Sequence, residues 1–339
     1  MAQHGVLQAS ILTKQVQSSV GEIIKEDDSQ VTMGDFAAQA ILIGLLHHTF
    51  PNDRFVGEET SAVLRGAPDL CGRVYDLVQT VTAKMGHQPT STEEMLTWID
   101  LGGRGPGGDK GRIWVLDPID GTAAFLRGQQ YAVSLSLIND GQEVLGVLGC
   151  PNISSNMTRI SETDIDHEGF GIMLSAVRGR GVTIRSMAPE GLGDPTPLSF
   201  PLDDCLSDKN LHIVGCTACE VTRHDHISRL AREFNTKFPN TEIWSSHIRY
   251  AALILGTGNV QFWIPKSSES KLHIWDHAGS QLIFTEMGGK VTDLDGRSIE
   301  FGAGRDLYRN RGLVVARGEI HQKLLKAIND IYHAVESSK

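Results

Sequence analysis

Residues 112–122, with the sequence RIWVLDPIDGT, determine how the rest of the chain is interpreted. The apolar run at 113–116 is typical of a buried strand. Pro118 fixes its own φ and disfavours a helical conformation at the preceding residue, so the chain is predicted to turn where the strand ends. The carboxylates of Asp117 and Asp120 can then point into one space.

The end of this stretch suits an anion beside cations. Gly121 and Thr122 are predicted to open a helix, and backbone N–H groups at a helix start attract phosphate. Oxygen ligands without soft donors favour magnesium. A lone D-P-x-D string would be explained more simply as a strand followed by an acidic turn. The full string DPIDGT, residues 117–122, is much more specific.

Length and composition limit the class of protein. The chain has 339 residues, enough for one large or two medium domains, and its 36 glycines and 40% hydrophobic content fit a globular α/β protein. Acidic residues outnumber basic residues by 41 to 31, for a net charge of −10. This balance argues against a nucleic-acid binder. An anionic substrate would need bound cations to reverse the local field.

The chain shows no sign of membrane insertion or export. No apolar run approaches the length of a transmembrane helix, and the N-terminus lacks the apolar core of a signal peptide. The five cysteines show no disulfide framework, so we expect a reduced, cytoplasmic protein without a membrane partner. Cys216 and Cys219 could form half a zinc site, but no second cysteine pair follows them.

The N-terminal half alternates helical and extended patterns. An amphipathic helix is predicted at 5–24, a polar loop at 25–30 and a second helix that begins at the N-cap residue Asp35. Residues 61–100 are predicted to be largely helical. Asp140 and Gly141 lie between two alternating runs, which is a strong hairpin signal.

The C-terminal half again alternates strand and helix patterns, which favours α/β layering. A soft boundary near residue 158 divides the chain into predicted domains at 1–158 and 159–339. The elements expected after residue 210 are strands at 211–214, 242–244 and 260–264, and helices after His224, at 250–255, up to 287 and at 320–335.

Four separated motifs support one family. They are Gly34-Asp35, Gly57-Glu58-Glu59, the string at 117–122, and Trp275-Asp276 before Gly288-Gly289. Together they make nearly the whole chain similar to the lithium-sensitive, magnesium-dependent phosphatase superfamily, which includes the inositol monophosphatases. Further strings resemble the 3′(2′),5′-bisphosphate nucleotidases within it: VTMGDFAAQ at 31–39, VGEE at 56–59, FLRG at 125–128, GCPN at 149–152, IWDHA at 274–278 and FGAGR at 301–305.

The resemblance implies two to three magnesium ions. One would be held by Glu58, Asp117 and the backbone carbonyl of Ile119. A second would be held by Asp117, Asp120 and Asp276. A third ion, bound more weakly, would use Glu58 as a ligand. Such cations cancel the charge of a phosphate monoester, lower the pKa of the attacking water and stabilise the leaving alkoxide.

The resemblance also implies how water and phosphate are placed. Asp35 and Thr122 would orient and deprotonate the attacking water, since a threonine hydroxyl alone is a poor base. Gly121 and Thr122 would offer backbone N–H groups to the phosphate. The residues implied as nucleotide contacts are His224, Ser246, Arg249 and Arg305. Outside the resemblance, each of these could equally be a helix cap or a solvated charge.

Three positions depart from the family pattern. The lysine that usually follows Asp-Gly-Thr is replaced by Ala123, and the usual arginine before Ile264-Pro265 is replaced by Trp263. Trp263 could present an aromatic plane to the substrate where the family has a guanidinium. Arg249 replaces the more usual lysine, which keeps the charge and changes the geometry. Hydrolysis of a phosphomonoester is therefore better supported than the identity of the substrate.

The leading hypothesis is a monomeric phosphatase that removes the 3′-phosphate of adenosine 3′,5′-bisphosphate, with 3′-phosphoadenylyl sulfate as a second candidate substrate. This activity clears a by-product of sulfate assimilation, and the family is inhibited by lithium. An alternative is a related phosphatase for inositol phosphate or another phosphorylated metabolite. A non-catalytic nucleotide-binding relative is a third possibility, but all the expected acids are present. The resemblance implies a layered α/β/α/β/α sandwich.

Overall fold

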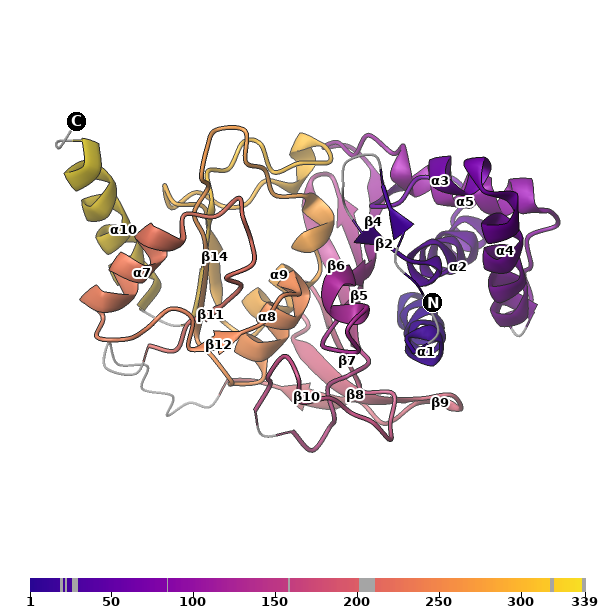
Figure 1. Ribbon diagram of the computed structural model, residues 1–339, viewed down its shortest axis with the longest axis horizontal. Coiled ribbons are helices and arrows are strands. Elements are labelled where there is room, and N and C mark those ends of the chain that lie inside the picture. Colours follow the sequence, from indigo (N-terminus) through magenta and orange to yellow (C-terminus); the bar gives the residue numbers. More distant parts are fainter. Residues whose placement is uncertain are drawn as a thin grey trace.

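The computed structural model shows a layered α/β/α/β/α arrangement, as the resemblance implies (Figure 1). It describes residues 1–18, 21, 23–25, 30–83, 85–157, 159–200, 211–317 and 320–336, with side chains up to residue 331. Within the described residues, no helix is long and apolar enough to cross a membrane. Four cysteines are described and all four are free, whereas Cys205 lies outside the described residues.

Helices from the N-terminal part cover one face of the larger sheet (Figure 1). Helices α1 and α2 pack on the sheet, and α4 and α5 pack against the outer side of α2. Their bounds are α1 (Ala2–Val16), α2 (Met33–Thr49), α3 (Ala62–Gly66), α4 (Pro68–Ala83) and α5 (Thr92–Gly103). A short hairpin of β1 (Ile23–Ile24) and β2 (Gln30–Val31) lies between α1 and α2 in the chain.

The larger sheet has eight strands. Its order is β10 (Thr196–Leu198), β8 (Val182–Ala188), β7 (Ile172–Val177), β6 (Gln142–Cys150), β5 (Ala132–Asn139), β4 (Arg112–Asp120) and β3 (Arg54–Gly57), with β9 (Gly191–Leu192) beside β8. The predicted hairpin is confirmed: β5 and β6 pair antiparallel around Asp140 and Gly141, both at positive φ. Strand β3 pairs parallel with β4 and thus ends at the same sheet edge as the DPIDGT string.

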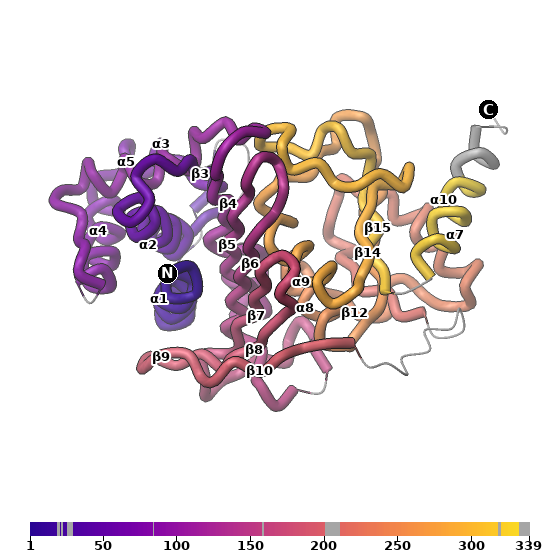
Figure 2. The backbone as a smooth tube through the Cα atoms, turned by 180° about the vertical axis from the view of Figure 1, so that it is seen from behind, coloured from indigo at the N-terminus to yellow at the C-terminus, as the bar shows by residue number. Residues whose placement is uncertain are grey.

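A central helical layer separates this sheet from the smaller ones (Figure 2). Helix α9 packs against β6 and β7, and α8 packs against α9 and β5. The elements of this layer and those beyond it are α7 (His224–Glu233), α8 (Ser246–Ile254), η2 (Ile274–Asp276), α9 (Ser280–Glu286), η3 (Phe301–Ala303) and α10 (Ile320–Glu336). The smaller sheets contain β11 (Val214–Gly215), β12 (Thr241–Glu242), β13 (Val260–Trp263), β14 (Lys290–Thr292) and β15 (Leu313–Ala316).

The structure corrects two sequence predictions near the N-terminus. Helix α1 ends at Val16 rather than at 24, and the β-branched pair Ile23–Ile24 forms a strand instead. The N-cap of α2 is Thr32, not Asp35. Asp35 instead accepts hydrogen bonds from the Thr32 backbone N–H at 2.8 Å and hydroxyl at 2.7 Å, which is a capping box. Residues 26–29 of the predicted loop lie outside the described residues.

The division of the chain at residue 158 remains a prediction. Strands β3–β6 precede this position, whereas β7–β10 follow it and continue the same sheet. The part of the chain after β10 joins this sheet through the central helices, where two glycines allow the backbones to approach closely. A Cβ on Gly146 of β6 would lie 2.3 Å from the carbonyl oxygen of Gly279, which precedes α9 and has φ +89°. This contact places the η2–α9 segment directly against the larger sheet.

Candidate active site

Three carboxylates from distant parts of the chain meet at the end of β4. Asp117 and Asp120 come from the DPIDGT string, and Asp276 ends the short η2 helix. One oxygen of each lies within 4.8 Å of the others. This set of oxygen donors is the kind that holds a hard divalent cation.

An irregularity in β4 lets both of its aspartates face this space. Asp117 pairs with Ser134 and Asp120 with Ala132, and the register shifts between them. The Asp117 Oδ1 atom accepts the backbone N–H of Ile119 at 3.1 Å, which closes the turn around Pro118. Regular strand alternation would instead direct these two side chains to opposite faces of the sheet.

Asp120 is fixed by the first turn of α8. Its carboxylate accepts the backbone N–H of Ser246 at 3.2 Å, the backbone N–H of His247 at 2.6 Å and the Ser245 hydroxyl. The next residue, Gly121, has φ +91°, and a Cβ there would lie 2.9 Å from the Cβ of Ser245. Glycine is therefore required where the DPIDGT turn meets α8.

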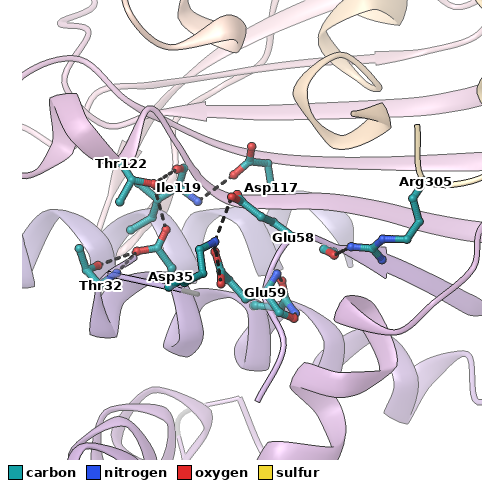
Figure 3. A network of polar contacts seen from close by, with 11 residues as sticks. Thr32, Asp35, Glu58, Glu59, Asp117, Ile119, Thr122 and Arg305 are labelled. Atoms are coloured by element: carbon teal, nitrogen blue, oxygen red, sulfur yellow. Dashed lines mark hydrogen bonds and ion pairs between the residues drawn. The ribbon is translucent and has the colours of Figure 1, made fainter. Parts of the chain in front are cut away.

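Glu58 follows β3 and lies beside Asp117 (Figure 3). The side chain of the neighbouring Glu59 does not point toward Asp117 and is buried. Lys25 approaches both: its Nζ lies 3.4 Å from Glu58 Oε1 and 2.9 Å from Glu59 Oε1. Burial alone would lower the pKa of Lys25, but the Glu58 and Glu59 carboxylates raise it above its usual value.

Burial and mutual repulsion make the charged forms of these acids unfavourable. Burial raises the pKa of Asp117 well above its usual value, and Glu58, Asp120 and Asp276 raise it further. The pKa of Asp276 is raised in the same way, by burial first and then by Asp120 and Glu58. Divalent cations would relieve the repulsion and restore the charged carboxylates. The residues present therefore fit a magnesium site.

Asp35 and Thr122 lie at the side of this cluster (Figure 3). The Thr122 Oγ1 atom is 3.5 Å from Asp35 Oδ1 and 3.1 Å from the carbonyl oxygen of Ile119. Burial raises the pKa of Asp35 to about 7, although the hydrogen bonds from Thr32 oppose this shift. A carboxylate with this pKa is well suited to accept a proton near neutral pH.

The comparison with known proteins identifies this arrangement. Residues 5–333 match the model of the inositol monophosphatase family. The chain belongs to the inositol monophosphatase family. It is 38% identical over 339 residues to the 3′(2′),5′-bisphosphate nucleotidase of Schizosaccharomyces pombe, a match that covers 95% of this chain and 92% of the relative.

Other members of the family agree with this result. The 3′(2′),5′-bisphosphate nucleotidase of Emericella nidulans is 34% identical, and the match covers 98% of this chain and 97% of the relative. A solved IMPase/NADP phosphatase complexed with Mg2+ and phosphate is 18% identical, with a TM-score of 0.59 over 94% of this chain and 90% of the other. The solved structure supports the fold, and the curated relatives support the family.

Two of the predicted nucleotide contacts lie on α8, next to the acids. The Ser246 backbone binds Asp120, and its hydroxyl accepts a hydrogen bond from Arg249 at 2.9 Å. The Arg249 guanidinium also donates to the carbonyl oxygens of Ile243 at 3.1 Å and Trp244 at 2.9 Å. These contacts hold the Arg249 guanidinium on the backbone that precedes α8. The role of Arg249 toward a nucleotide stays a prediction.

The other predicted contacts come from separate elements. Arg305 donates to the carbonyl oxygens of Gly57, Gly102 and Gly105 at 2.7–3.0 Å, and its guanidinium lies 4.6 Å from the centre of the Trp275 ring. Arg305 thus holds the backbone immediately before Glu58 in place (Figure 3).

Two aromatic rings complete the predicted set. Trp263, at the end of β13, is 8% exposed and packs in the core. His224 begins α7, and its Nε2 atom lies 2.8 Å from the carbonyl oxygen of Cys219. The imidazole stacks on Phe238 with the ring centres 5.8 Å apart. Within the described residues, no hydrogen bond or ring contact joins these two rings to the carboxylate cluster, and their roles stay predictions.

Sequence reasoning missed several residues that shape the site. Thr32 could have been found, because a threonine three residues before an acid is a capping-box signal. Ser245 is a typical N-cap residue, but nothing local indicates that it binds Asp120, 125 positions away. Lys25 lies in a polar segment that carries no motif. Such long-range contacts become visible only in the folded chain.

Proposed function

We propose that the chain is a magnesium-dependent phosphomonoesterase that removes the 3′-phosphate of adenosine 3′,5′-bisphosphate, giving AMP and phosphate. It would act on 3′-phosphoadenylyl sulfate in the same way and release adenylyl sulfate. The convergence of Asp117, Asp120 and Asp276 is the observation that carries this proposal. The two curated relatives, both named 3′(2′),5′-bisphosphate nucleotidases, support the choice of substrate.

Two to three magnesium ions would be held at this site. Glu58, Asp117 and the carbonyl of Ile119 would hold one, and Asp117, Asp120 and Asp276 would hold another. When bound, magnesium supplies charge neutralisation and activates water for attack on phosphorus. The chain contributes fixed ligand positions, because the Asp117 carboxylate accepts a hydrogen bond from its own turn and the Asp120 carboxylate accepts one from α8.

Asp35 and Thr122 would handle the proton of the attacking water. Asp35 Oδ2 accepts a hydrogen bond from the Thr32 hydroxyl, which leaves Oδ1 facing the Thr122 hydroxyl. Thr122 Oγ1 can then accept a hydrogen bond from water while it donates its own proton to Asp35 Oδ1. A pKa of about 7 lets Asp35 be ionised at neutral pH and still take up a proton.

The remaining side chains would place the substrate. Gly121 and Thr122 would donate backbone N–H groups to the phosphate oxygens. The residues proposed to bind the nucleotide are His224, Ser246, Arg249, Trp263 and Arg305. A cytoplasmic location and a monomeric state remain predictions from the sequence.

The direct test is phosphate release from a panel of phosphomonoesters. Adenosine 3′,5′-bisphosphate should exceed inositol phosphate at least about tenfold in kcat/KM, which is about 1.4 kcal/mol of transition-state discrimination. Release should require magnesium and fall with added lithium. Release without added metal, in the presence of a chelator, would contradict the proposal.

One observation favours an alternative substrate of the same phosphatase. Arg249 uses its donors on carbonyl oxygens of its own chain, and Ala123 and Trp263 replace two basic residues of the family pattern. A pocket with fewer basic side chains available to phosphate suits a substrate that carries one phosphate group rather than two. If a monophosphate exceeds the bisphosphate in the panel, this second function is correct.

A further inference from the structure

Lys25 places a positive charge at the edge of the carboxylate cluster. It follows strand β1 and lies in the segment between α1 and α2. Its Nζ atom is 2.9 and 3.2 Å from the two oxygens of Glu59 and 3.4 Å from Glu58 Oε1. The side chain is only 17% exposed, so the ammonium group lies largely out of solvent beside these acids.

We propose that Lys25 is a tethered competitor for divalent cations: its ammonium group occupies the outer cation position on Glu58 and leaves Glu58 when a divalent ion binds there. The inference rests on the proposed metal site, since Glu58 is one of its expected ligands. It assigns to Lys25 the role of setting the affinity of the weakest ion. Lys25 touches no reacting atom and is therefore a positioning residue.

The geometry supports displacement of Lys25 from Glu58 alone. The Glu59 carboxylate contacts Lys25 through both oxygens, whereas Glu58 contributes one oxygen at a longer distance. A divalent ion bound to Glu58 carries twice the charge of the ammonium group and repels it at this separation. The flexible four-carbon stem of lysine lets the ammonium group shift, which a backbone donor could not do.

A permanent Lys25–Glu59 ion pair is the simpler alternative. It would neutralise buried Glu59 in every state and would not respond to metal. Removing its charge would then strengthen binding of every cation by an amount that falls with distance, and the accessibility of the Lys25 amine would be the same with and without metal. Competition instead predicts that only the ions that use Glu58 are strengthened, that the ion on Asp117, Asp120 and Asp276 is not, and that metal frees the Lys25 amine.

The first test is titration of chelator-treated protein with Mn2+, with free ion measured by electron paramagnetic resonance and no substrate present. Lys25→Gln should tighten the weakest Mn2+ at least about fivefold and leave at least one other Mn2+, the ion that does not use Glu58, within about twofold. Lys326→Gln, an exposed substitution of the same kind on α10, should match the wild type. Equal tightening at all sites, or none, would overturn the role of Lys25. If neither protein binds Mn2+, the metal site fails as well.

A second measurement uses the wild-type protein, in case Lys25→Gln does not fold. Reductive methylation followed by mass spectrometry reports how accessible each lysine amine is. Saturating Mg2+ should raise labelling of Lys25 at least about threefold. Lys14 is the internal control, since its Nζ donates to Asn152 and to the carbonyl oxygen of Pro151, away from the acids. Labelling of Lys25 that does not change with Mg2+ would refute displacement.

Discussion

Asp120 accepts the backbone N–H of His247 at 2.6 Å, and this bond joins the end of β4 to the first turn of α8 across 127 positions of the chain. The Ser245 hydroxyl and the Ser246 N–H bind the same carboxylate. Asp120 therefore has two tasks: it is a proposed metal ligand, and it holds the central helical layer against the larger sheet. Substitutions at this position should affect both activity and stability.

Asp120→Ala should abolish metal-dependent phosphate release and also reduce stability. The alanine leaves three donors, two of them buried, without their acceptor, which costs about 1–3 kcal/mol. Phosphate release and denaturant unfolding in a chelator measure the two effects separately. Asp120→Asn is the matched variant: it keeps one acceptor oxygen, so it should lose activity while losing less stability. Normal turnover in either variant would exclude Asp120 from the mechanism.

Asp35→Asn and Thr122→Ala should each lower kcat by about 10²–10⁴ at neutral pH, the range expected when a general base is lost. The acidic limb of the kcat/KM profile, at or below pH about 7, should disappear in Asp35→Asn because its side chain does not titrate. Thr122→Ser keeps the hydroxyl and is the control that should retain most of the activity. A Thr122→Ala enzyme with a normal rate would rule out proton transfer through this residue.

Glu143 should make the fold less stable as the pH rises. It is 4% exposed and accepts hydrogen bonds from Gly279 N–H and Gln281, and burial raises its pKa to about 7. The folded chain thus holds this proton more tightly than the unfolded chain. The resulting stability is complete below pH about 4.5 and is lost as the pH rises through about 7.

Glu143→Gln cannot titrate, so its free energy of unfolding should fall less between pH 5 and 8 than that of the wild type. The difference should be about 2–3 kcal/mol, from the pKa shift at about 1.4 kcal/mol per unit. Denaturant unfolding at the two pH values, in a chelator, measures it. Glu190→Gln, an exposed substitution, is the control. Identical slopes for all three proteins would show that Glu143 does not cause the loss.

Arg305→Lys should lower stability and weaken metal binding together. Lysine cannot reproduce the fork that serves the Gly57, Gly102 and Gly105 carbonyls, and the expected cost is about 1–3 kcal/mol. Because Gly57 precedes Glu58, the Mn2+ affinity should also fall. Arg309→Lys, at an exposed ion pair with Glu300, should change stability by less than about 1 kcal/mol. A raised KM with unchanged stability would instead indicate direct nucleotide contact.

Local signals in the sequence predicted much of this fold. The hairpin at Asp140 and Gly141 and the strand ending in DPIDGT were predicted correctly because turn chemistry and apolar runs act over a few residues. Helix α1 was predicted too long, since Ile23 and Ile24 continue its apolar pattern although they pair as a strand. The N-cap of α2 was misplaced by three residues because Thr32 and Asp35 share the capping box.

The supporting contacts of the site could not be predicted in the same way. The acids were recognised as motifs, but the bonds from Ser245 and His247 to Asp120 depend on how α8 packs. The role of Arg305 toward a nucleotide stays a prediction, but its hydrogen bonds to three backbone carbonyls were not predicted. A charged side chain has several possible partners, and only the tertiary packing selects among them.

The closely packed backbones of Gly146 and Gly279 have a consequence for biosynthesis. During synthesis, β4 emerges from the ribosome with Asp117 and Asp120 long before Asp276 is translated. The growing polypeptide therefore carries an incomplete set of ligands until the segment around Gly279 has emerged and docked onto β6. Chains truncated before this segment would lack Asp276, so the proposed activity would require synthesis to pass it.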